Sequence, residues 1–170
     1  MLVYIIIAYI LFMFVLVRLV VPYLGFWREP IPKTLPSGLL NTIRTLKSKH
    51  SSPEKFARAA HAFLAKKYYG SHILTIIRLD LVFSRDISRM WALSGYMACN
   101  QQNWLLYLML IKSGFFSPDD VRFRITTIVG SIHQYMQVRL NNKWVSVDVW
   151  AYRYGVPFGK RSGLFGAKVI

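Results

Sequence analysis

The chain has 170 residues, and 22 Lys and Arg against 7 Asp and Glu give it a formal net charge of +15. This length fits one compact domain plus one accessory element and excludes two full domains. A hydrophobic content of 54% excludes a disordered chain. The basic charge favours anionic partners, namely phospholipid headgroups, nucleic acid or acidic polymers, without choosing among them.

Residues 1–27 are the most apolar part of the chain, and Arg18 is their only charged side chain. About 20 apolar residues in a helix cross a bilayer, so we expect a single-pass membrane anchor here. A basic leader region and a small-residue cleavage site are not evident, which favours an uncleaved anchor over a signal peptide. We expect Tyr23, Phe26 and Trp27 to form an aromatic belt at the interface. The excess of Lys and Arg after the anchor predicts a cytoplasmic soluble domain.

A linker and two helices are predicted next. Residues 28–38 contain three prolines and predict an extended linker that lifts the domain off the membrane. Ser37 is the predicted N-cap of the first helix, whose apolar positions recur at helical spacing. Ser52 as N-cap and Pro53 at the first helical position predict a second helix that runs to Gly70.

The segment 72–90 suits a helix by its apolar spacing and a strand by its β-branched residues, and we favour a helix. A long, mostly buried helix is predicted from Cys99 to a stop at Ser113–Gly114. The apolar period then changes to two, which predicts strands at 121–129, 132–140 and 143–150.

The turn between the last two strands fixes their register. Asn141–Asn142 is a credible two-residue turn because Asn tolerates positive φ. Leu140 then pairs with Lys143, and His133 becomes a diagonal cross-strand neighbour of Asp148. Such neighbours lie about 7–8 Å apart at Cα, so an imidazole can meet a carboxylate there. The register therefore predicts a base and the acid that orients it.

Cys99 is the only cysteine, which excludes an intramolecular disulfide and a metal site of several thiolates. A lone cysteine is most often a small buried hydrophobe. A helix N-terminus, however, stabilises a thiolate, and so does a nearby imidazolium. In such an arrangement Cys99 attacks a carbonyl carbon, His133 moves the proton and Asp148 orients the ring.

The stretch CNQQNWLLYLMLIKSGF, followed by HQYMQVRLNNKWVSVDVW, resembles the core of the transglutaminase-like superfamily of papain-like thiol enzymes. The resemblance covers residues 91–150. It implies an α+β fold, with helices packed on a small antiparallel sheet, in a domain spanning 39–150. It also implies Cys99 as nucleophile, His133 as base and Asp148 as orienting acid.

Four aromatic residues are candidates for the substrate cleft, with core packing as the alternative for the first two: Trp91, Tyr96, Tyr135 and Trp150. Residues 151–170 are rich in Gly and basic residues and predict a tail or a flap at the cleft mouth. A Gly-rich phosphate loop and a dinucleotide fingerprint are absent, so we expect no cofactor. Three histidines lack metal-ligand spacing, so we expect no metal site and predict surface or packing roles for them: His50, His61 and His72.

These observations predict membrane-tethered acyl transfer from an amide or peptide through a thioester on Cys99. Water as acceptor would make a peptidase or amidase, and a lysine amine would make a crosslinking enzyme. The Asp-Cys-Ser motif of cell-wall peptidases is absent around Cys99. The alternative class is a catalytically inactive membrane adaptor whose basic domain binds anionic lipid, nucleic acid or an acidic partner. A nucleic-acid-binding motif is not recognised, and the oligomeric state does not follow from the sequence.

Overall fold

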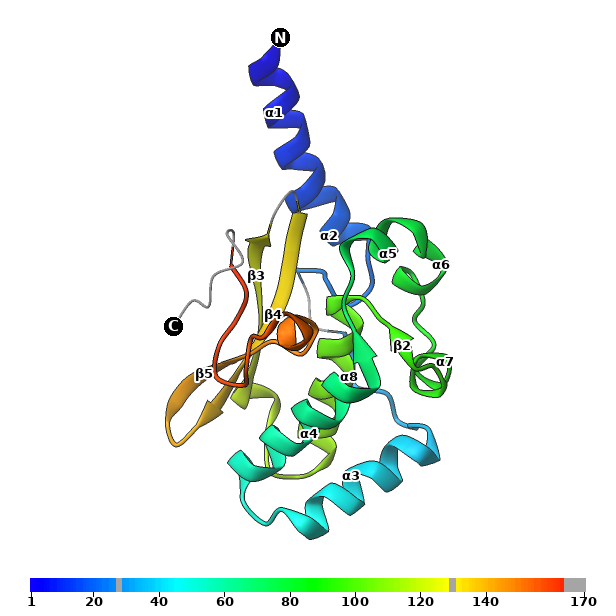
Figure 1. The fold of residues 1–170 in the computed structure, drawn as a ribbon, viewed down its shortest axis with the longest axis vertical. Helices are drawn as coiled ribbons and strands as arrows, with labels where there is room; N and C mark the ends of the chain where they lie inside the picture. The colour runs from blue at the N-terminus through cyan, green and yellow to red at the C-terminus, as the bar shows by residue number, and fades with distance from the viewer. Residues whose placement is uncertain (27–28, 129–130, 164–170) are drawn as a thin grey trace.

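The computed structural model describes residues 1–26, 29–128 and 131–163. It begins with one continuous helical rod that projects from the rest of the molecule (Figure 1). The rod runs from α1 (Leu2–Leu11) through a π-helical turn, η1 (Phe12–Leu16), into α2 (Val17–Val20). The stretch Val3–Val20 is long and apolar enough to cross a membrane, and none of it is buried in the domain.

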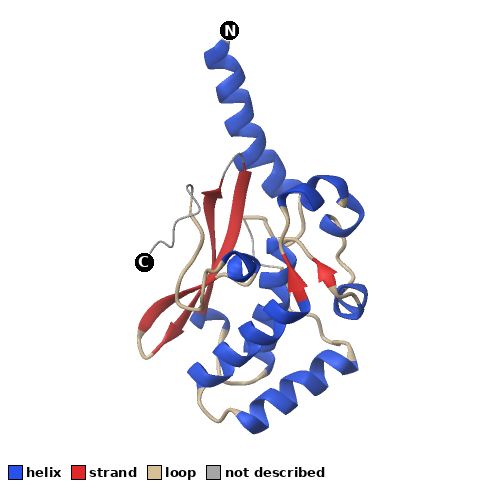
Figure 2. Cartoon of the chain, in the orientation of Figure 1, coloured by secondary structure: helices blue, strands red, loops and turns tan. Residues whose placement is uncertain are grey.

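The remaining chain is a mixed α+β domain, which confirms the predicted class at that level (Figure 2). Its helices are α3 (Ser37–Lys49), α4 (Pro53–Lys67), α5 (His72–Ile77), α6 (Leu79–Val82), α7 (Ile87–Ala92) and α8 (Cys99–Lys112), with 3₁₀ turns η2 (Pro118–Asp120) and η3 (Trp150–Tyr154). Its strands are β1 (Tyr68–Tyr69), β2 (Gly95–Tyr96), β3 (Val121–Ile128), β4 (Ser131–Leu140) and β5 (Lys143–Val147). Strands β1 and β2 form a short parallel pair, and β3, β4 and β5 form an antiparallel sheet in that order.

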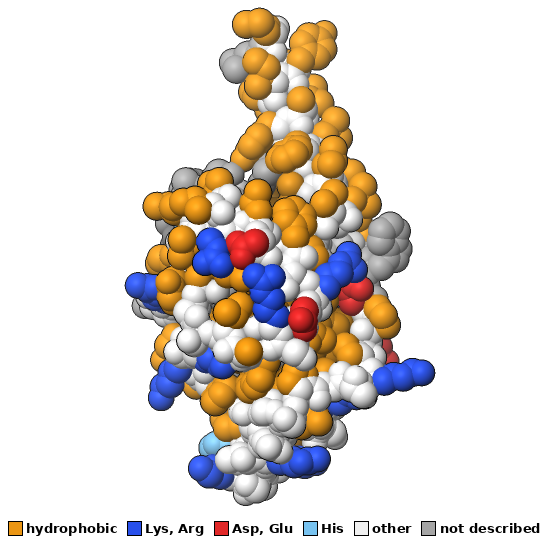
Figure 3. All heavy atoms as spheres, turned by 90° about the vertical axis from the view of Figure 1, so that its right-hand side faces the viewer, with side chains coloured by type: hydrophobic (Ala, Val, Ile, Leu, Met, Phe, Trp, Pro, Cys, Tyr) orange, Lys and Arg blue, Asp and Glu red, His pale blue; other side chains and the backbone are white. Residues whose placement is uncertain are grey.

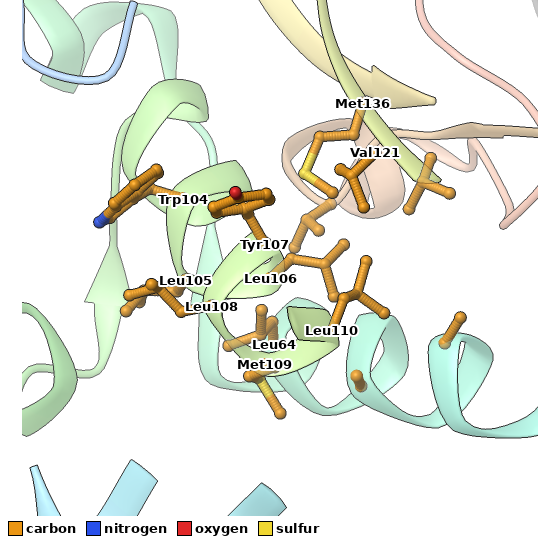
Figure 4. Close-up of a cluster of buried hydrophobic side chains, with 14 of the residues drawn as sticks. Leu64, Trp104, Leu105, Leu106, Tyr107, Leu108, Met109, Leu110, Val121 and Met136 are labelled. Carbon is orange, nitrogen blue, oxygen red and sulfur yellow. The ribbon is translucent and has the colours of Figure 1, made fainter. Parts of the chain in front are cut away.

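Helix α8 lies between the antiparallel sheet and helices α3 and α4 (Figure 1). Every residue from 100 to 110 is buried, so this helix has no solvent face along that stretch. In Figure 4, Leu106 packs toward Met136 of β4, while Met109 lies beside Leu64 of α4. Burial of each such side chain contributes about 1.5–3 kcal/mol, so α8 is the axis of the core.

The predicted hairpin and its register are confirmed. Asn141 and Asn142 have φ values of 48° and 62°, as a two-residue turn requires. Leu140 pairs with Lys143, and the pairing continues through β4 and β5. Strand β5 ends at Val147 instead of residue 150, because Val149 takes a helical backbone conformation that begins η3.

The helix predictions hold with differences at the ends. Segment 72–90 is helical, in three short helices. The Ser52 hydroxyl accepts from the Lys55 amide at 3.3 Å, as an N-cap should. Helix α4 ends at Lys67, because the next two residues pair with β2. The Ser37 cap prediction is wrong: Pro36 occupies the cap position, and α3 starts at Ser37 without a side-chain cap.

Tyr23 of the predicted aromatic belt and two residues of the predicted linker pack against the domain, whereas Phe26 is exposed. Tyr23 has φ of 60°, which turns the chain back after α2 and stacks the ring on Trp104 at a centroid distance of 4.9 Å. Its place in the belt was therefore predicted wrongly; Trp27 lies outside the described residues. Ile31 and Leu35, from the predicted linker, are partly buried against the core. The root of the N-terminal helix is thus joined directly to the domain.

Candidate functional site

The centre of the candidate site is a buried ion pair between two strands. His133 lies on β4, and Asp148 follows β5 directly. With the imidazole protonated, His133 Nε2–H donates to Asp148 Oδ2 at 2.9 Å, and both side chains are fully buried. The hairpin turn places them, because it sets β5 in register with β4 and brings the chain after Val147 alongside His133.

The charges of this pair support each other. Burial on its own lowers the pKa of His133, but the charge and hydrogen bond of Asp148, with a smaller contribution from the Cys99 thiol, raise it well above its usual value. Burial would raise the pKa of Asp148, yet the imidazolium and two hydrogen bonds from Ser162 hold it below its usual value. The pair is therefore an imidazolium and a carboxylate at neutral pH.

Cys99 begins α8 and approaches this pair from the other side. Strand β2 pairs with β1, and the Met97 amide donates to the Tyr69 carbonyl at 3.1 Å, which fixes the chain just before the cysteine. Because Nε2 of His133 faces Asp148, Nδ1 is the ring nitrogen left for the thiol. Nδ1 is buried and has no hydrogen-bond partner among the described residues, and the nearby Cys99 thiol contributes to the raised pKa of His133. Cys99 itself is half-buried, so a reactant can reach it.

The first turn of α8 is free to receive negative charge. Ala98 holds the N-cap position, and in the described part of the chain no side chain caps the helix. The first amide groups of a helix lack partners within it. They can therefore donate to an oxyanion that forms next to Cys99.

Buried amides hold that first turn in place. The Asn100 side chain donates to the Pro22 carbonyl at 2.6 Å, and Gln102 donates to the Met97 carbonyl at 2.7 Å. Asn103 donates to the Gln134 carbonyl on β4 at 2.7 Å. The Asn103 bond joins the cysteine helix to the strand that carries His133, so the spacing of Cys99 and His133 is set by the fold.

Ser162 completes the shell around Asp148 and was missed in the sequence. Its amide and hydroxyl both donate to Oδ2 of Asp148, at 3.0 and 2.8 Å. The Ala151 amide donates to Oδ1 at 3.1 Å. The predicted tail or flap is therefore packed on the domain as far as it is described, through residue 163, and residues 164–170 lie outside the described part.

The Trp150 ring packs between His133 of the candidate site and His72 at the start of α5. Its ring lies 5.0 Å from that of His133 and 4.9 Å, edge-on, from that of His72. Cys99 packs against the same small apolar cluster. A Cβ at Gly70 would come within 2.0 Å of the Trp150 indole nitrogen, so only glycine lets this ring sit here.

The predicted cleft residues separate into three groups. Trp150 and Tyr96 lie near the thiol: Tyr96 donates to the Thr75 hydroxyl at 2.9 Å, and burial, with a contribution from Cys99, raises the pKa of Tyr96 to about 12. Tyr135 lies on β4 under the guanidinium of Arg161, 5.0 Å from its ring centre.

Trp91 packs elsewhere. It stacks on Phe63 at 5.9 Å and lies under the Lys67 ammonium. These neighbours belong to α4, so Trp91 fills the interface between α7 and α4, and its core alternative describes its position.

The other histidines differ in their surroundings. His61 is buried and its Nε2 meets the backbone carbonyl of Asp148 at 3.4 Å, so it supports the loop after β5. His72 touches Trp150, and burial together with the charge of His133 lowers its pKa. Among the described residues, no group of three or more His, Cys, Asp or Glu could hold a metal ion.

A small apolar cavity of about 140 Å³ adjoins the pair. It is lined by His72, Ile128, Trp150, Ala151, Tyr154, Val156, Ser162 and Gly163. Larger cavities of about 310 and 460 Å³ lie elsewhere, one at the root of the N-terminal helix and one beside the hairpin turn. Only the small one shares residues with the shell of His133 and Asp148 among these three.

No protein-family model matches the chain, and neither does any curated protein or solved structure.

Proposed function

We propose that the chain is a membrane-anchored thiol enzyme that takes an acyl group from an amide onto Cys99. One observation carries the proposal: the buried His133–Asp148 pair uses Nε2 and leaves Nδ1 without a partner in the described part of the chain, while the half-buried Cys99 thiol is close enough to affect the pKa of His133. A buried ion pair costs free energy unless its remaining donors and acceptors also find partners. A structural role does not require an unpaired imidazole nitrogen beside a cysteine.

The proposed reaction has two balanced steps. The Cys99 thiolate attacks the amide carbonyl carbon, the first amides of α8 bind the oxyanion, and His133 Nδ1–H donates its proton to the departing amine as the C–N bond breaks. A water then attacks the thioester after giving a proton to Nδ1. The C–S bond breaks, the acid leaves and the thiolate returns. Asp148 keeps the ring oriented throughout and stabilises its positive charge before the first proton transfer and after the second.

Water is the proposed acceptor, which makes the activity that of a peptidase or amidase. A lysine amine in place of water would give protein crosslinking by the same first step. The 140 Å³ cavity is lined mostly by apolar side chains and includes Trp150, whose cluster Cys99 packs against, which favours a substrate with an apolar acyl group or side chain. The resemblance to transglutaminase-like enzymes supports this assignment of roles.

We also propose that the segment Val3–Val20 anchors the enzyme in a membrane with the domain on the cytoplasmic side. The helix has the necessary length and composition and projects freely from the domain. The domain that follows it carries nearly all of the chain's excess of Lys and Arg. Positive charge next to a span favours the cytoplasmic side.

The direct test uses p-nitrophenyl acetate as an acyl donor for the full-length protein in detergent. We expect a burst of about one nitrophenolate per chain, as acetyl transfers to Cys99, with a thioester that hydroxylamine removes. Cys99→Ala should lose the burst, and His133→Gln should slow it by about 10²–10⁴-fold. Folding of each variant is checked by circular dichroism.

A burst of equal size in Cys99→Ala would overturn the proposal. An absent burst in folded wild-type protein would also overturn it and would favour the adaptor, whose basic surface is then tested for salt-dependent binding to anionic lipid or nucleic acid.

A further inference from the structure

Helices α5 and α6 expose a row of large apolar side chains to solvent. Ile73, Ile76 and Ile77 are 68%, 75% and 66% exposed. Leu79 and Phe83 extend the same surface and are also exposed. We call these five residues the apolar shoulder. Scattered exposed apolar residues are common in soluble proteins, but a contiguous group marks a surface that is covered by something apolar.

The apolar shoulder lies at the end of the domain from which the N-terminal helix projects. Figure 1 shows α5 and α6 beside α2, and in Figure 3 apolar side chains on this face continue from the helix down to a band of Lys, Arg, Asp and Glu. Ionic side chains accompany the shoulder: Arg78 and Arg89 both pair with Asp80, at 2.9 and 3.2 Å. An apolar surface bordered by ionic groups is typical of protein that rests in a membrane interface.

Hydrogen bonds fix the shoulder relative to the helix. The Gln101 side chain donates to the carbonyls of Leu81 and Ser84 at the end of α6, and Asn100 donates to the Pro22 carbonyl at the root of α2. The Tyr23 hydroxyl, also from that root, donates to the Arg85 carbonyl at 2.9 Å. The first turn of α8 therefore holds both the root of the N-terminal helix and the apolar shoulder. Because their relative position is fixed, the two can contact the same surface at once.

A bilayer is the occupant that this arrangement favours. The apolar N-terminal helix already implies a hydrocarbon layer that starts next to the shoulder, whereas a second copy of the chain would have to fit beside that layer. The helix and the shoulder form one continuous apolar surface, and the domain's cationic excess suits anionic headgroups.

We propose that α5 and α6 insert their apolar shoulder into the membrane leaflet next to the N-terminal helix, so that Cys99 works at the lipid surface. Helix α5 is also a wall of the candidate site, because its first residue, His72, contacts Trp150 and its Thr75 accepts from Tyr96. The substrates reached in this position are acyl donors held at the membrane surface. This inference rests on the proposed membrane anchor and does not depend on catalysis.

The experiment measures where α5 lies in a bilayer. Full-length protein with Cys99→Ser carries either Ile76→Cys or, as the matched control, Lys143→Cys at the exposed start of β5. Each new thiol is labelled with nitrobenzoxadiazole, and the protein is reconstituted in vesicles of phosphatidylcholine and phosphatidylglycerol. Doxyl-labelled phosphatidylcholine is the quencher in the lipid, and iodide is the quencher in water.

We expect doxyl lipid to quench the label at position 76 and iodide to leave it unaffected, with the reverse at position 143. A label at position 76 that iodide quenches and doxyl lipid does not would overturn the inference. Protection from both quenchers would overturn it as well, and would indicate that protein covers the shoulder. Release of the chain from vesicles by alkaline carbonate would overturn the anchor and this inference together, whereas the thioester test of Cys99 would still stand.

Discussion

Proteins usually bury apolar side chains and expose polar ones. The first turn of α8 and the helices α5 and α6 depart from this rule in opposite ways. The turn buries four amide side chains in a row, 100–103, next to the buried His133 and Asp148. Helix α5 exposes three isoleucines and helix α6 exposes Leu79. The two regions are neighbours, because Gln101 donates to the carbonyls of Leu81 and Ser84 at the end of α6.

Both departures lower the folding stability of the protein. A buried polar group is costly unless it is hydrogen-bonded. The four amides donate to backbone carbonyls, but the buried oxygens of Gln102 and Asn103 have no partner among the described residues. An exposed isoleucine forgoes about 1.5–3 kcal/mol of burial. We propose thiol chemistry as the reason for the first departure and a membrane surface as the reason for the second, and the two proposals can be tested separately.

The largest effect is expected from Asp148→Asn, which removes the charge that holds His133 as an imidazolium. The pKa of His133 then falls, since the largest contribution that opposes burial is lost, and the acyl burst should slow by about 10²–10⁴-fold. The burst rate with p-nitrophenyl acetate measures this. Asp119→Asn, at an exposed position, is the matched control and should keep the wild-type rate. A native rate in Asp148→Asn would remove the buried pair from the mechanism.

Gly70→Ala should disturb the candidate site through packing alone. The new Cβ would meet the Trp150 ring at about 2 Å, and the overpacking should cost about 1–3 kcal/mol of unfolding free energy. Denaturant unfolding provides the measurement. Gly155→Asn is the control, because that site has open space and a positive φ that Asn tolerates. Equal stability of Gly70→Ala and wild type would show that Trp150 is not held as described.

Ser162→Ala removes the hydrogen bond from the Ser162 hydroxyl to Asp148, while the hydrogen bond from the backbone N–H of residue 162 remains. We expect a loss of about 1 kcal/mol. The folded pKa of Asp148 is lowered, so its contribution is present above the unfolded value and is lost as pH falls through the folded pKa. The variant raises that folded pKa, so acid destabilisation should begin at a higher pH. Unfolding midpoints between about pH 2 and pH 5 test this, and Ser146→Ala on β5 should not shift the profile.

The smallest effect is expected from Ile76→Ser, because this side chain is mostly exposed. The unfolding free energy should change by less than about 0.5 kcal/mol. Leu81→Ala, in the adjacent helix but buried, should cost about 2–5 kcal/mol by comparison. A large loss in Ile76→Ser would mean that the shoulder is part of the core, and the contrast between the two regions would disappear.

Local rules were enough to predict the hairpin and the start of α8. Asn141–Asn142 takes the positive φ values that the turn needs, so the register and the approach of His133 to Asp148 followed from counting. The apolar residues from Trp104 to Ile111 likewise predicted a buried helix, although the burial of the four amides at 100–103 did not follow from them.

Contacts between distant segments could not be predicted in this way. Ser162 reaches Asp148 across a 3₁₀ turn and an irregular segment, and its sequence has no periodic pattern that shows this. Gly70 and Trp150 meet across 80 positions of the chain. Tyr23 looked like an interfacial aromatic by composition, but its positive φ turns it into the core.

The most direct test of the central claim is the rate at which iodoacetamide alkylates Cys99 in the full-length protein, measured from about pH 5.5 to pH 9. An ordinary thiol, with a pKa of about 8.5, reacts slowly near pH 6. Because the pKa of His133 is raised, the imidazolium persists across this range, and we predict fast alkylation near pH 6 that His133→Gln slows by about 10-fold or more. Slow alkylation in folded wild-type protein, unchanged by His133→Gln, would contradict the account.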